Sequence, residues 1–324
     1  MVELIADVIR QGRRFFVTMH RRPDGDAAGS SLALACALRE MGKTVFHYNA
    51  DPLPFNFRFL PGADQIERKE FQGPFDAAFV CDTPRLDEIA DGLPVVSAGR
   101  GVLISIDHHA GAESYGDLNL LDPSAAAAGV LVYKLLQHLE HPISVDVAHN
   151  LFAAIMSDTG SFRYDSTDAE SLRICADLLA CGVSPWQLSS RIYETQPFNR
   201  VKLLSSVLAT LELAEQGRLA ILTATREMLR ICGSGDDMLD GFVNYARSVE
   251  GVEVALILVE QDENEYEATF RSRGEIDLGS LAVVLGGRGG GNGACARLTG
   301  TLMEVKQRAS GAVGDLFSAD TAVA

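Results

Sequence analysis

Short apolar runs alternate with amphipathic stretches through the first half of the chain. Apolar runs bounded by Gly, Pro or charged residues predict buried strands at 14–19, 44–48, 76–81 and 102–106. Apolar residues at helical spacing predict helices at 30–41, 125–139 and 145–156. Strands that alternate with helices are typical of a mostly parallel sheet covered by helices. We therefore predict an α/β fold, with a first domain over residues 1–194.

The pattern changes after residue 194. Residues 195–200 (TQPFNR) interrupt the apolar runs and precede a helical pattern at 201–213, which predicts a linker with a helix at 195–214. Further elements then predict a smaller C-terminal α/β domain at 215–324: strands at 218–224, 252–260 and 266–271, a helix at 277–285 and a Gly-rich loop at 286–293. Trp186 is expected to pack against the linker, and the last ten residues are expected to fray.

Composition and charge narrow the classes of function. The chain has 324 residues, which suffices for two domains, and no apolar run reaches the ~18 residues needed to cross a bilayer. Its net charge of −16 argues against an extended nucleic-acid groove, because such grooves are built from clustered Lys and Arg. The charged N-terminus does not resemble a secretory signal, and the six cysteines lack zinc-type spacing. We expect a cytoplasmic protein with reduced thiols and no membrane partner.

Histidines and carboxylates gather at four places in the first domain, three of them at the carboxyl ends of predicted strands. They are His20, Asp24 and Asp26 after the first strand, Asp82 after the third, Asp107, His108 and His109 after the fourth, and Asp158 after the helix 145–156. Each group alone is a common turn or helix cap. The carboxyl ends of parallel strands meet at one edge, however, and burying these acids together without a cation would be costly. Imidazole with carboxylate suits Mn²⁺, with Mg²⁺ or Co²⁺ as alternatives.

Four sequence motifs carry a resemblance to a known family. HRRPDGDAAGS, VCDTP, IDHHA and MSDTGSFRY occur in this order and are similar to the four motifs of DHH phosphoesterases. Their spacing resembles the short bacterial branch, the nano-RNases (oligoribonucleases) that also dephosphorylate 3′-phosphoadenosine 5′-phosphate. The resemblance covers nearly the whole chain. It implies a DHH catalytic domain at 1–194 and a DHH-associated substrate-binding domain at 215–324.

The resemblance also implies a role for each residue of the motifs. One of two Mn²⁺ ions would be held by His20, Asp24 and Asp82, and the other by Asp26, Asp82, His108 and Asp158, with Asp82 as the bridge. Asp107 would orient a histidine. His109 would lie near the scissile phosphate and stabilise charge or help to protonate the leaving oxygen. The two ions would activate a shared water for attack on phosphorus.

Two segments of the second domain are candidate substrate contacts. Arg271, Ser272 and Arg273 end a predicted strand, and guanidinium groups bind phosphate in a bidentate manner. The alternative for this segment is a solvated edge strand. With the resemblance, a phosphate contact is favoured.

The Gly-rich loop is the second candidate contact, because glycines let backbone N–H groups approach a phosphate. Its predicted contacts are Gly290, Gly291 and Asn292. Relatives usually carry His after the glycine run and Ala-Ala-Gly further on. This chain has Asn292 and Arg297 at the positions of the His and the last Gly, so substrate choice can differ from the family norm.

Three functions remain open from the sequence. The first is a metal-dependent exonuclease-type phosphodiesterase on short single-stranded RNA or DNA that also acts on 3′-phosphoadenosine 5′-phosphate. The second is a phosphodiesterase for a cyclic dinucleotide or another small nucleotide. The third is a non-catalytic nucleotide-binding regulator, against which the complete set of ligands argues. A homodimer is compatible with the sequence.

Overall fold

The chain forms two units, Met1–Thr195 and Gln196–Ala324, which are described separately below. The structure is a computed structural model, and it describes residues 1–69, 73–89, 101–274 and 276–321. None of the described helices is both long enough and apolar enough to cross a bilayer.

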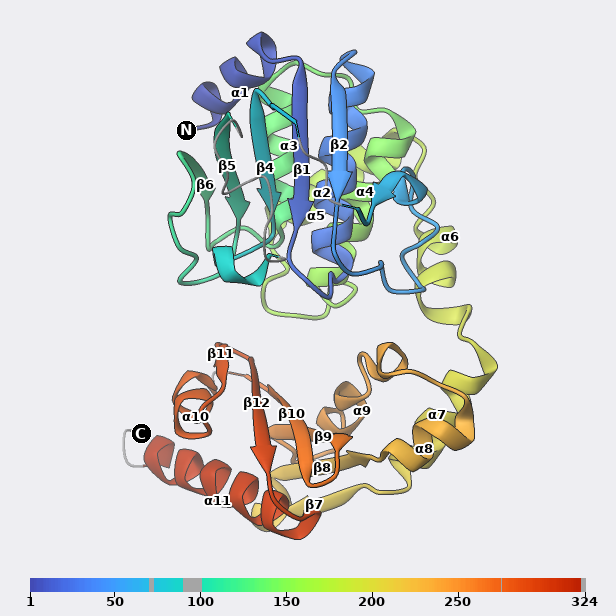
Figure 1. Ribbon diagram of the computed structural model, residues 1–324, viewed down its shortest axis with the longest axis vertical. Coiled ribbons are helices and arrows are strands. Elements are labelled where there is room, and N and C mark those ends of the chain that lie inside the picture. The colour runs from blue at the N-terminus through green and yellow to red at the C-terminus, as the bar shows by residue number, and fades with distance from the viewer. Residues whose placement is uncertain (70–72, 90–100, 275, 322–324) are drawn as a thin grey trace. The chain divides into compact units, whose positions relative to one another are not determined.

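The first unit is built on a six-stranded sheet with the order β3-β2-β1-β4-β5-β6 (Figure 1). Every strand pair in it is parallel. The strands are β1 Arg14–Met19, β2 Thr44–Tyr48, β3 Ile66–Glu67, β4 Ala77–Cys81, β5 Val102–Asp107 and β6 Leu118–Leu121. The chain builds outward from β1 through β2 and β3, and then returns to add β4, β5 and β6 on the other side. The strand order therefore reverses between β1 and β4, and such a switch point is where parallel sheets bind ligands.

Helices pack on one face of this sheet and confirm the predicted parallel, helix-covered fold (Figure 1). They are α1 Val2–Gln11, α2 Gly25–Glu40, α3 Ala128–His138, α4 Val145–Asp158, α5 Ala169–Ala180 and α6 Pro185–Ser189, the last followed by a π-helical turn at Ser190–Glu194. Phe15, Val17 and Met19 of β1 point into the core that these helices share. Phe16 points to the other face, into a smaller apolar cluster.

The structure corrects the predicted limits of two helices that carry site residues. The helix predicted at 30–41 begins at Gly25, because Asp24 caps it by accepting hydrogen bonds from the N–H groups of Asp26 and Ala27, both at 3.0 Å. The helix predicted to stop at 156 continues to Asp158. Asp26 therefore lies in the first turn of α2, and Asp158 ends α4.

Glycines bring α2 close to α4. A Cβ at Gly29 would lie 2.5 Å from the carbonyl oxygen of Asn150 and 2.8 Å from the backbone nitrogen of Ala154. A Cβ at Gly25 would lie 2.3 Å from the hydroxyl oxygen of Ser157. Without Cβ atoms at these positions the two helices can approach to backbone contact, and this places the start of α2 beside the end of α4.

Gly29→Ala is expected to lower the thermal midpoint of the protein by several degrees, because overpacking of this kind costs about 1–3 kcal/mol. Gly311→Ala in α11 (Leu302–Thr321) is the matched control, since nothing lies within 4 Å of the added Cβ. That change should be neutral or stabilising, because Ala favours helix over Gly. Scanning calorimetry of both variants checks the pair. An unchanged midpoint for Gly29→Ala would contradict the close packing.

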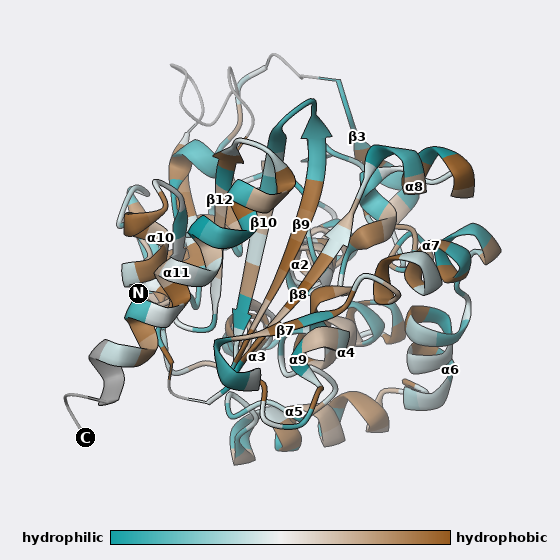
Figure 2. Ribbon diagram, turned by 90° about the horizontal axis from the view of Figure 1, so that it is seen from below, coloured by the Kyte–Doolittle hydropathy of each residue, from teal (hydrophilic) through white to brown (hydrophobic). Residues whose placement is uncertain are grey.

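The second unit is built on a mixed sheet with the order β11-β12-β10-β9-β8-β7. The pair β8–β9 is parallel and the other pairs are antiparallel. The strands are β7 Glu212–Ala214, β8 Leu219–Ala224, β9 Val254–Asp262, β10 Glu265–Ser272, β11 Arg288–Gly290 and β12 Gly293–Thr299. The central strands β8 and β9 are apolar along most of their length (Figure 2). Both faces of this sheet are therefore covered.

One face of the second sheet carries α10 and α11, and the other carries α7, α8 and α9. The bounds of these helices are α7 Phe198–Leu208, α8 Arg226–Cys232, α9 Val243–Arg247, α10 Gly279–Val284 and α11 Leu302–Thr321. The helix predicted at 201–213 thus begins earlier and ends at Leu208, because residues 212–214 pair with β8. The prediction that the last ten residues fray is wrong up to Thr321, which ends α11. Val313 and Phe317 hold that helix in the core.

Candidate metal centre

The acidic and histidine side chains of the first unit meet at the carboxyl edge of the sheet, beside the switch point between β1 and β4. His20 follows β1, Asp82 follows β4, and His108 follows β5. The start of α2 supplies Asp24 and Asp26, and the end of α4 supplies Asp158. Residues up to 138 positions apart in the chain therefore reach one place.

Three overlapping clusters of ligand atoms form there. Within each cluster, one ligand atom per residue lies within 4.8 Å of the others: His20 with Asp24 and Asp82, Asp26 with His108 and Asp158, and Asp82 with His108 and His109. The Asp82 carboxylate joins the first two clusters, because Oδ2 lies 3.9 Å from His20 Nε2 and Oδ1 lies 3.7 Å from His108 Nε2. His108 Nε2 lies 3.5 Å from Asp26 Oδ2 and 3.4 Å from Asp158 Oδ2.

Both histidines turn the same ring nitrogen toward the carboxylates. His20 Nδ1 lies 2.6 Å from the carbonyl oxygen of Arg21, and His108 Nδ1 lies 3.0 Å from the carbonyl oxygen of Ala125. A carbonyl oxygen only accepts hydrogen bonds, so Nδ1 is the donor in each ring, and Nε2 is the nitrogen that faces the carboxylates. This is the arrangement in which histidines bind metals, with the second nitrogen donating to a fixed acceptor.

Two carboxylates of these clusters, those of Asp26 and Asp82, are almost completely buried, and they differ in their hydrogen-bond partners. Asp26 accepts hydrogen bonds from the N–H groups of Ala128 (2.6 Å) and Gly129 (3.0 Å), at the start of α3. Asp82 Oδ1 has no hydrogen-bond partner among the described residues. The backbone of Asp82 has φ +52°, in the left-handed region that Asp and Asn tolerate better than most residues. Such an unpaired buried oxygen needs a positive charge beside it.

The pKa values of the carboxyl groups report the same shortage of positive charge in the metal-free chain. Burial raises the pKa of Asp82 well above its usual value, and the neighbouring charges of Asp26 and Asp24 raise it further. Burial also raises the pKa of Asp26, although His108 opposes this. For Asp158, burial and then the charge of Asp26 raise the pKa to about 7. A bound cation would remove this cost, so the donor set fits divalent metal ions.

Asp107 and His109 form a pair beside these clusters. Asp107 Oδ1 accepts a hydrogen bond from the backbone N–H of His109 at 2.7 Å and lies 3.2 Å from His109 Nδ1. Burial lowers the pKa of His109, but the hydrogen bond to Asp107 and its charge outweigh this and raise the pKa to about 9. His109 is therefore an imidazolium at neutral pH in the metal-free chain, with Nδ1 held by Asp107.

The predicted substrate contacts of the second unit lie at one end of β10. Arg271 is half-buried, Arg273 is exposed, and neither forms an ion pair with a described residue. Arg271 pairs with Gly293 of β12, and a Cβ there would lie 2.7 Å from Arg271 Nη1. Gly293 thus makes room for the guanidinium.

The Gly-rich segment predicted as a loop contains a β-hairpin, in which β11 pairs with the start of β12. Gly291 and Asn292 form its turn, between the paired Gly290 and Gly293, and Gly291 has φ +53°. Ser272 is fully buried: its hydroxyl donates to the carbonyl oxygen of Ile276 at 2.6 Å and its Oγ lies 3.2 Å from Asn292 Oδ1. The backbone N–H of Ser272 donates to the carbonyl oxygen of Asn292 at 3.0 Å and ties β10 to the hairpin, and Asn292 keeps its amide nitrogen as a donor.

The sequence did not reveal two interactions of the first unit. The N–H groups of Ala128 and Gly129 bind Asp26, although the alanine-rich stretch 124–129 carries no functional side chain to signal this. The second is the hydrogen bond that the Tyr193 hydroxyl oxygen accepts at 2.8 Å from Ser161, which lies three residues after Asp158. A helix N-terminus and a turn set by tertiary packing explain why neither was visible.

Comparisons with known proteins agree with this geometry. The sequence matches "DHH family, N-terminal domain" over residues 14–157 and "DHHA1 domain" over residues 232–319. It is 33% identical to a "Bifunctional oligoribonuclease and PAP phosphatase NrnA" of Thermus thermophilus over 92% of this chain and 89% of that protein. It is 29% identical to the protein of the same name in Bacillus subtilis, over 83% of this chain and 84% of that one.

A solved structure shares the fold of the chain. The crystal structure of an exopolyphosphatase-related protein from Bacteroides fragilis has a TM-score of 0.89 and covers 97% of this chain and 95% of that one, at 24% identity. At that identity the likeness establishes the fold.

Proposed function

Because this chain belongs to the DHH family and is a hydrolase of phosphoric ester bonds, we propose that its substrates are short single-stranded oligonucleotides and 3′-phosphoadenosine 5′-phosphate. The observation that carries the proposal is the position of Asp82, whose two oxygens face two clusters of ligand atoms. The names of the relatives from Thermus thermophilus and Bacillus subtilis support the choice of substrates.

The ligand atoms divide between two cation sites in this proposal. One site uses His20, Asp24 and Asp82, and the other uses Asp26, Asp82, His108 and Asp158. Mixed imidazole and carboxylate donors favour Mn²⁺, with Mg²⁺ or Co²⁺ as alternatives. When bound, divalent cations lower the pKa of water and stabilise negative charge on phosphoryl oxygens.

His109 acts on the substrate in this proposal, and Asp107 positions His109. Asp107 holds His109 Nδ1, so Nε2 is the atom that donates a hydrogen bond to the phosphate or a proton to the leaving oxygen. Burial lowers the pKa of His109, but the hydrogen bond to Asp107 raises it to about 9 in the metal-free chain, so Asp107 favours the protonated ring. Asp107 is a positioning residue, because it acts through His109.

The division of labour between the two parts of the chain also remains a proposal. Residues 1–194 would carry the catalytic domain, 195–214 the linker, and 215–324 the substrate-binding domain. The donors of the second unit would be Arg271, Arg273, the Asn292 amide and the backbone of Gly290 and Gly291, with the backbone N–H of Ser272 holding the hairpin. The net charge of −16 favours short substrates held by a local basic patch. A homodimer stays a prediction.

The six cysteines are free, four of them half-buried and two buried. Unpaired thiols in this number favour a reducing compartment, so we place the activity in the cytoplasm.

The experiment for the proposed function is a substrate panel with purified protein and Mn²⁺. The substrates are oligonucleotides from a dinucleotide to a 20-mer, 3′-phosphoadenosine 5′-phosphate and a cyclic dinucleotide. Release of mononucleotide from a pentanucleotide, together with phosphate from 3′-phosphoadenosine 5′-phosphate, supports the proposal. Turnover confined to the cyclic dinucleotide would replace it with the second function, and binding without turnover would replace it with a regulator.

Arg271→Ala is expected to raise KM for a pentanucleotide about tenfold and to lower kcat much less, because a charged hydrogen bond to a bound phosphate is lost. Steady-state kinetics with Mn²⁺ measures both constants. The matched control is Arg230→Ala, which removes an exposed arginine of the same unit that pairs with Glu227. A larger effect on kcat than on KM would show that Arg271 acts in the transition state instead.

A further inference from the structure

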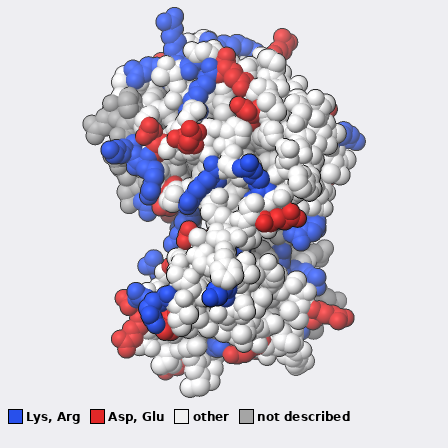
Figure 3. Space-filling model, turned by 90° about the vertical axis from the view of Figure 1, so that its right-hand side faces the viewer, with Lys and Arg blue, Asp and Glu red and all other residues white. Residues whose placement is uncertain are grey.

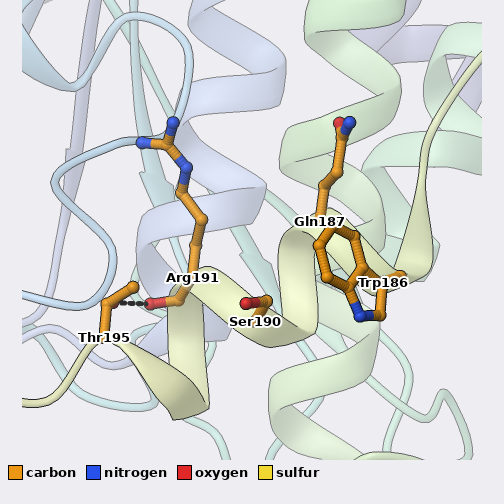
Figure 4. A pocket seen from close by; sticks show the side chains of 5 residues that line it. All are labelled: Trp186, Gln187, Ser190, Arg191 and Thr195. Atoms are coloured by element: carbon orange, nitrogen blue, oxygen red, sulfur yellow. Dashed lines mark hydrogen bonds between the residues drawn. The ribbon is translucent and has the colours of Figure 1, made fainter.

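A cavity of about 480 Å³ opens on the first unit beside α6 and the π-helical turn (Figure 4). Its lining residues are Trp186, Gln187, Ser190, Arg191 and Thr195. We propose that this cavity holds a base of bound single-stranded nucleic acid, with Trp186 stacking on the base and Arg191 contacting a neighbouring phosphate. The proposal rests on the proposed function and adds a second contact region for the same substrate, within the first unit.

Trp186 is presented to solvent although its helix is anchored without it. The indole is 72% exposed, and Leu188 is the buried residue of α6. The prediction that Trp186 packs against the linker is therefore wrong. An exposed aromatic face at the rim of a cavity suits a base, because bases of every type stack on aromatic rings with little regard to sequence.

The other side of the cavity carries a cation. Figure 4 shows the side chains of Trp186 and Arg191 on opposite sides of the opening, with Ser190 between them. The Arg191 guanidinium lies over the ring of Phe59, 5.4 Å from its centroid, and Arg191 makes no ion pair with a described residue. The guanidinium is thus positioned by an aromatic ring while its charge stays available for a phosphate.

The turn that carries Arg191 is held by its own hydrogen bonds. Thr195 Oγ1 donates to the carbonyl oxygen of Arg191 at 2.6 Å, and Ser190 Oγ donates to the Glu194 carboxylate at 3.0 Å. The Glu194 carboxylate therefore pairs with Ser190 within the turn.

Basic and acidic side chains are interspersed over the face of the first unit that carries α6 (Figure 3), so the attraction for nucleic acid is local.

Two segments connect the metal centre with the turn that carries Arg191. Ser161 lies three residues after Asp158, a distance of at most about 11 Å along the chain, and its hydroxyl donates to the Tyr193 hydroxyl oxygen at 2.8 Å. Phe59, under Arg191, belongs to the segment that leaves the carboxyl end of β2. In this proposal, an oligonucleotide with its scissile phosphate at the metal centre extends its other nucleotides toward Trp186.

Trp186 is the only tryptophan of the chain, so its fluorescence reports on this cavity alone. The direct test titrates a pentanucleotide into the full-length protein with a chelator present, so that no turnover occurs. Saturable quenching is the expected result. Unchanged fluorescence at a pentanucleotide concentration that saturates turnover would overturn the proposal.

Kinetics with Mn²⁺ gives the second readout. Trp186→Ala should raise KM for the pentanucleotide at least about fivefold more than KM for 3′-phosphoadenosine 5′-phosphate, because only the longer substrate has a base that reaches the cavity. Trp186→Phe should restore most of the difference, since it keeps a stacking face. Phe198→Ala is the matched control, because Phe198 is 77% exposed and lies outside the cavity.

The outcomes separate the two proposals. Equal effects of Trp186→Ala on both substrates, or a Trp186→Phe variant as impaired as Trp186→Ala, would overturn the base site while the proposed function stands. Quenching by the pentanucleotide without its hydrolysis by the wild-type protein would support the base site and overturn the proposed function.

Discussion

Asp82→Ala is expected to abolish turnover. Asp82 is 1% exposed, and its two oxygens lie 3.9 Å from His20 Nε2 and 3.7 Å from His108 Nε2. The change removes the group shared by both clusters, and with it the site that fits two cations. Phosphate release from 3′-phosphoadenosine 5′-phosphate measures the effect. Retention of more than about a tenth of the wild-type rate would contradict the assignment.

Asp82→Asn separates a lost ligand from a lost fold. Alanine is strained at φ +52°, whereas Asn tolerates this conformation and keeps the shape of Asp. The amide also removes a charge that burial and four neighbouring carboxylates disfavour. Asp82→Asn should therefore be inactive, more heat-stable than the wild type without metal, and unable to gain the full stabilisation by Mn²⁺.

Thermal midpoints with and without Mn²⁺ test this pair of effects. A ligand that binds only the folded state raises its stability, so the wild-type midpoint should rise with Mn²⁺. The control is Asp262→Asn, which changes an exposed carboxylate of the second unit. An Asp82→Asn variant that responds to Mn²⁺ as fully as this control would remove Asp82 from the ligand set.

The metal-free protein is expected to lose stability as pH rises from about 4 to about 7. The pKa of Asp158 is about 7 in the folded chain and about 3.9 in the unfolded chain. Between these values the folded state binds more protons than the unfolded state, so the free energy of unfolding falls with rising pH. Asp82 and Asp26, whose pKa values are also raised, add to this loss.

Urea unfolding in chelator, followed by far-ultraviolet circular dichroism, measures this dependence. With saturating Mn²⁺ the dependence should reverse over the same range, because cations bind the ionised carboxylates. Asp158→Asn should flatten the metal-free curve, while leaving the contribution of the overall net charge. A metal-free protein that is more stable at pH 8 than at pH 5.5 would contradict the raised pKa values.

The central strands were predictable because burial on both faces leaves a clear record in the sequence. The bounds of β1, Arg14–Met19, and β2, Thr44–Tyr48, agree with the prediction to the residue. The start of α2 was not predictable, because Asp24-Gly25-Asp26 has the composition of a turn and becomes helical only through capping and contact with α4. The β11–β12 hairpin was missed for a related reason, since its glycines carry no strand preference and pair through β12.

The candidate site follows from the sequence as far as parallel strands place their carboxyl ends together. That rule brings His20, Asp82 and His108 to one edge, as the structure has them. Nothing in the sequence indicated the left-handed backbone of Asp82 or the amides that hold Asp26, because both depend on the packing of segments far apart in the chain. The exposure of Trp186 could not be predicted from the sequence either, because a local sequence pattern does not show which segments cover a helix.

Asp26 contacts both the metal centre and the backbone of α3. This affects the choice of an inactive variant for capturing uncleaved RNA. The Asp26 carboxylate clamps the first turn of α3 through Ala128 and Gly129 as well as facing His108. Removing it would loosen the scaffold along with the chemistry, so a dead protein made this way would say little about recognition. Asp158 accepts no hydrogen bond from a backbone N–H group of the described residues. Substitution of Asp158 should therefore remove activity while it leaves the fold and ligand binding intact.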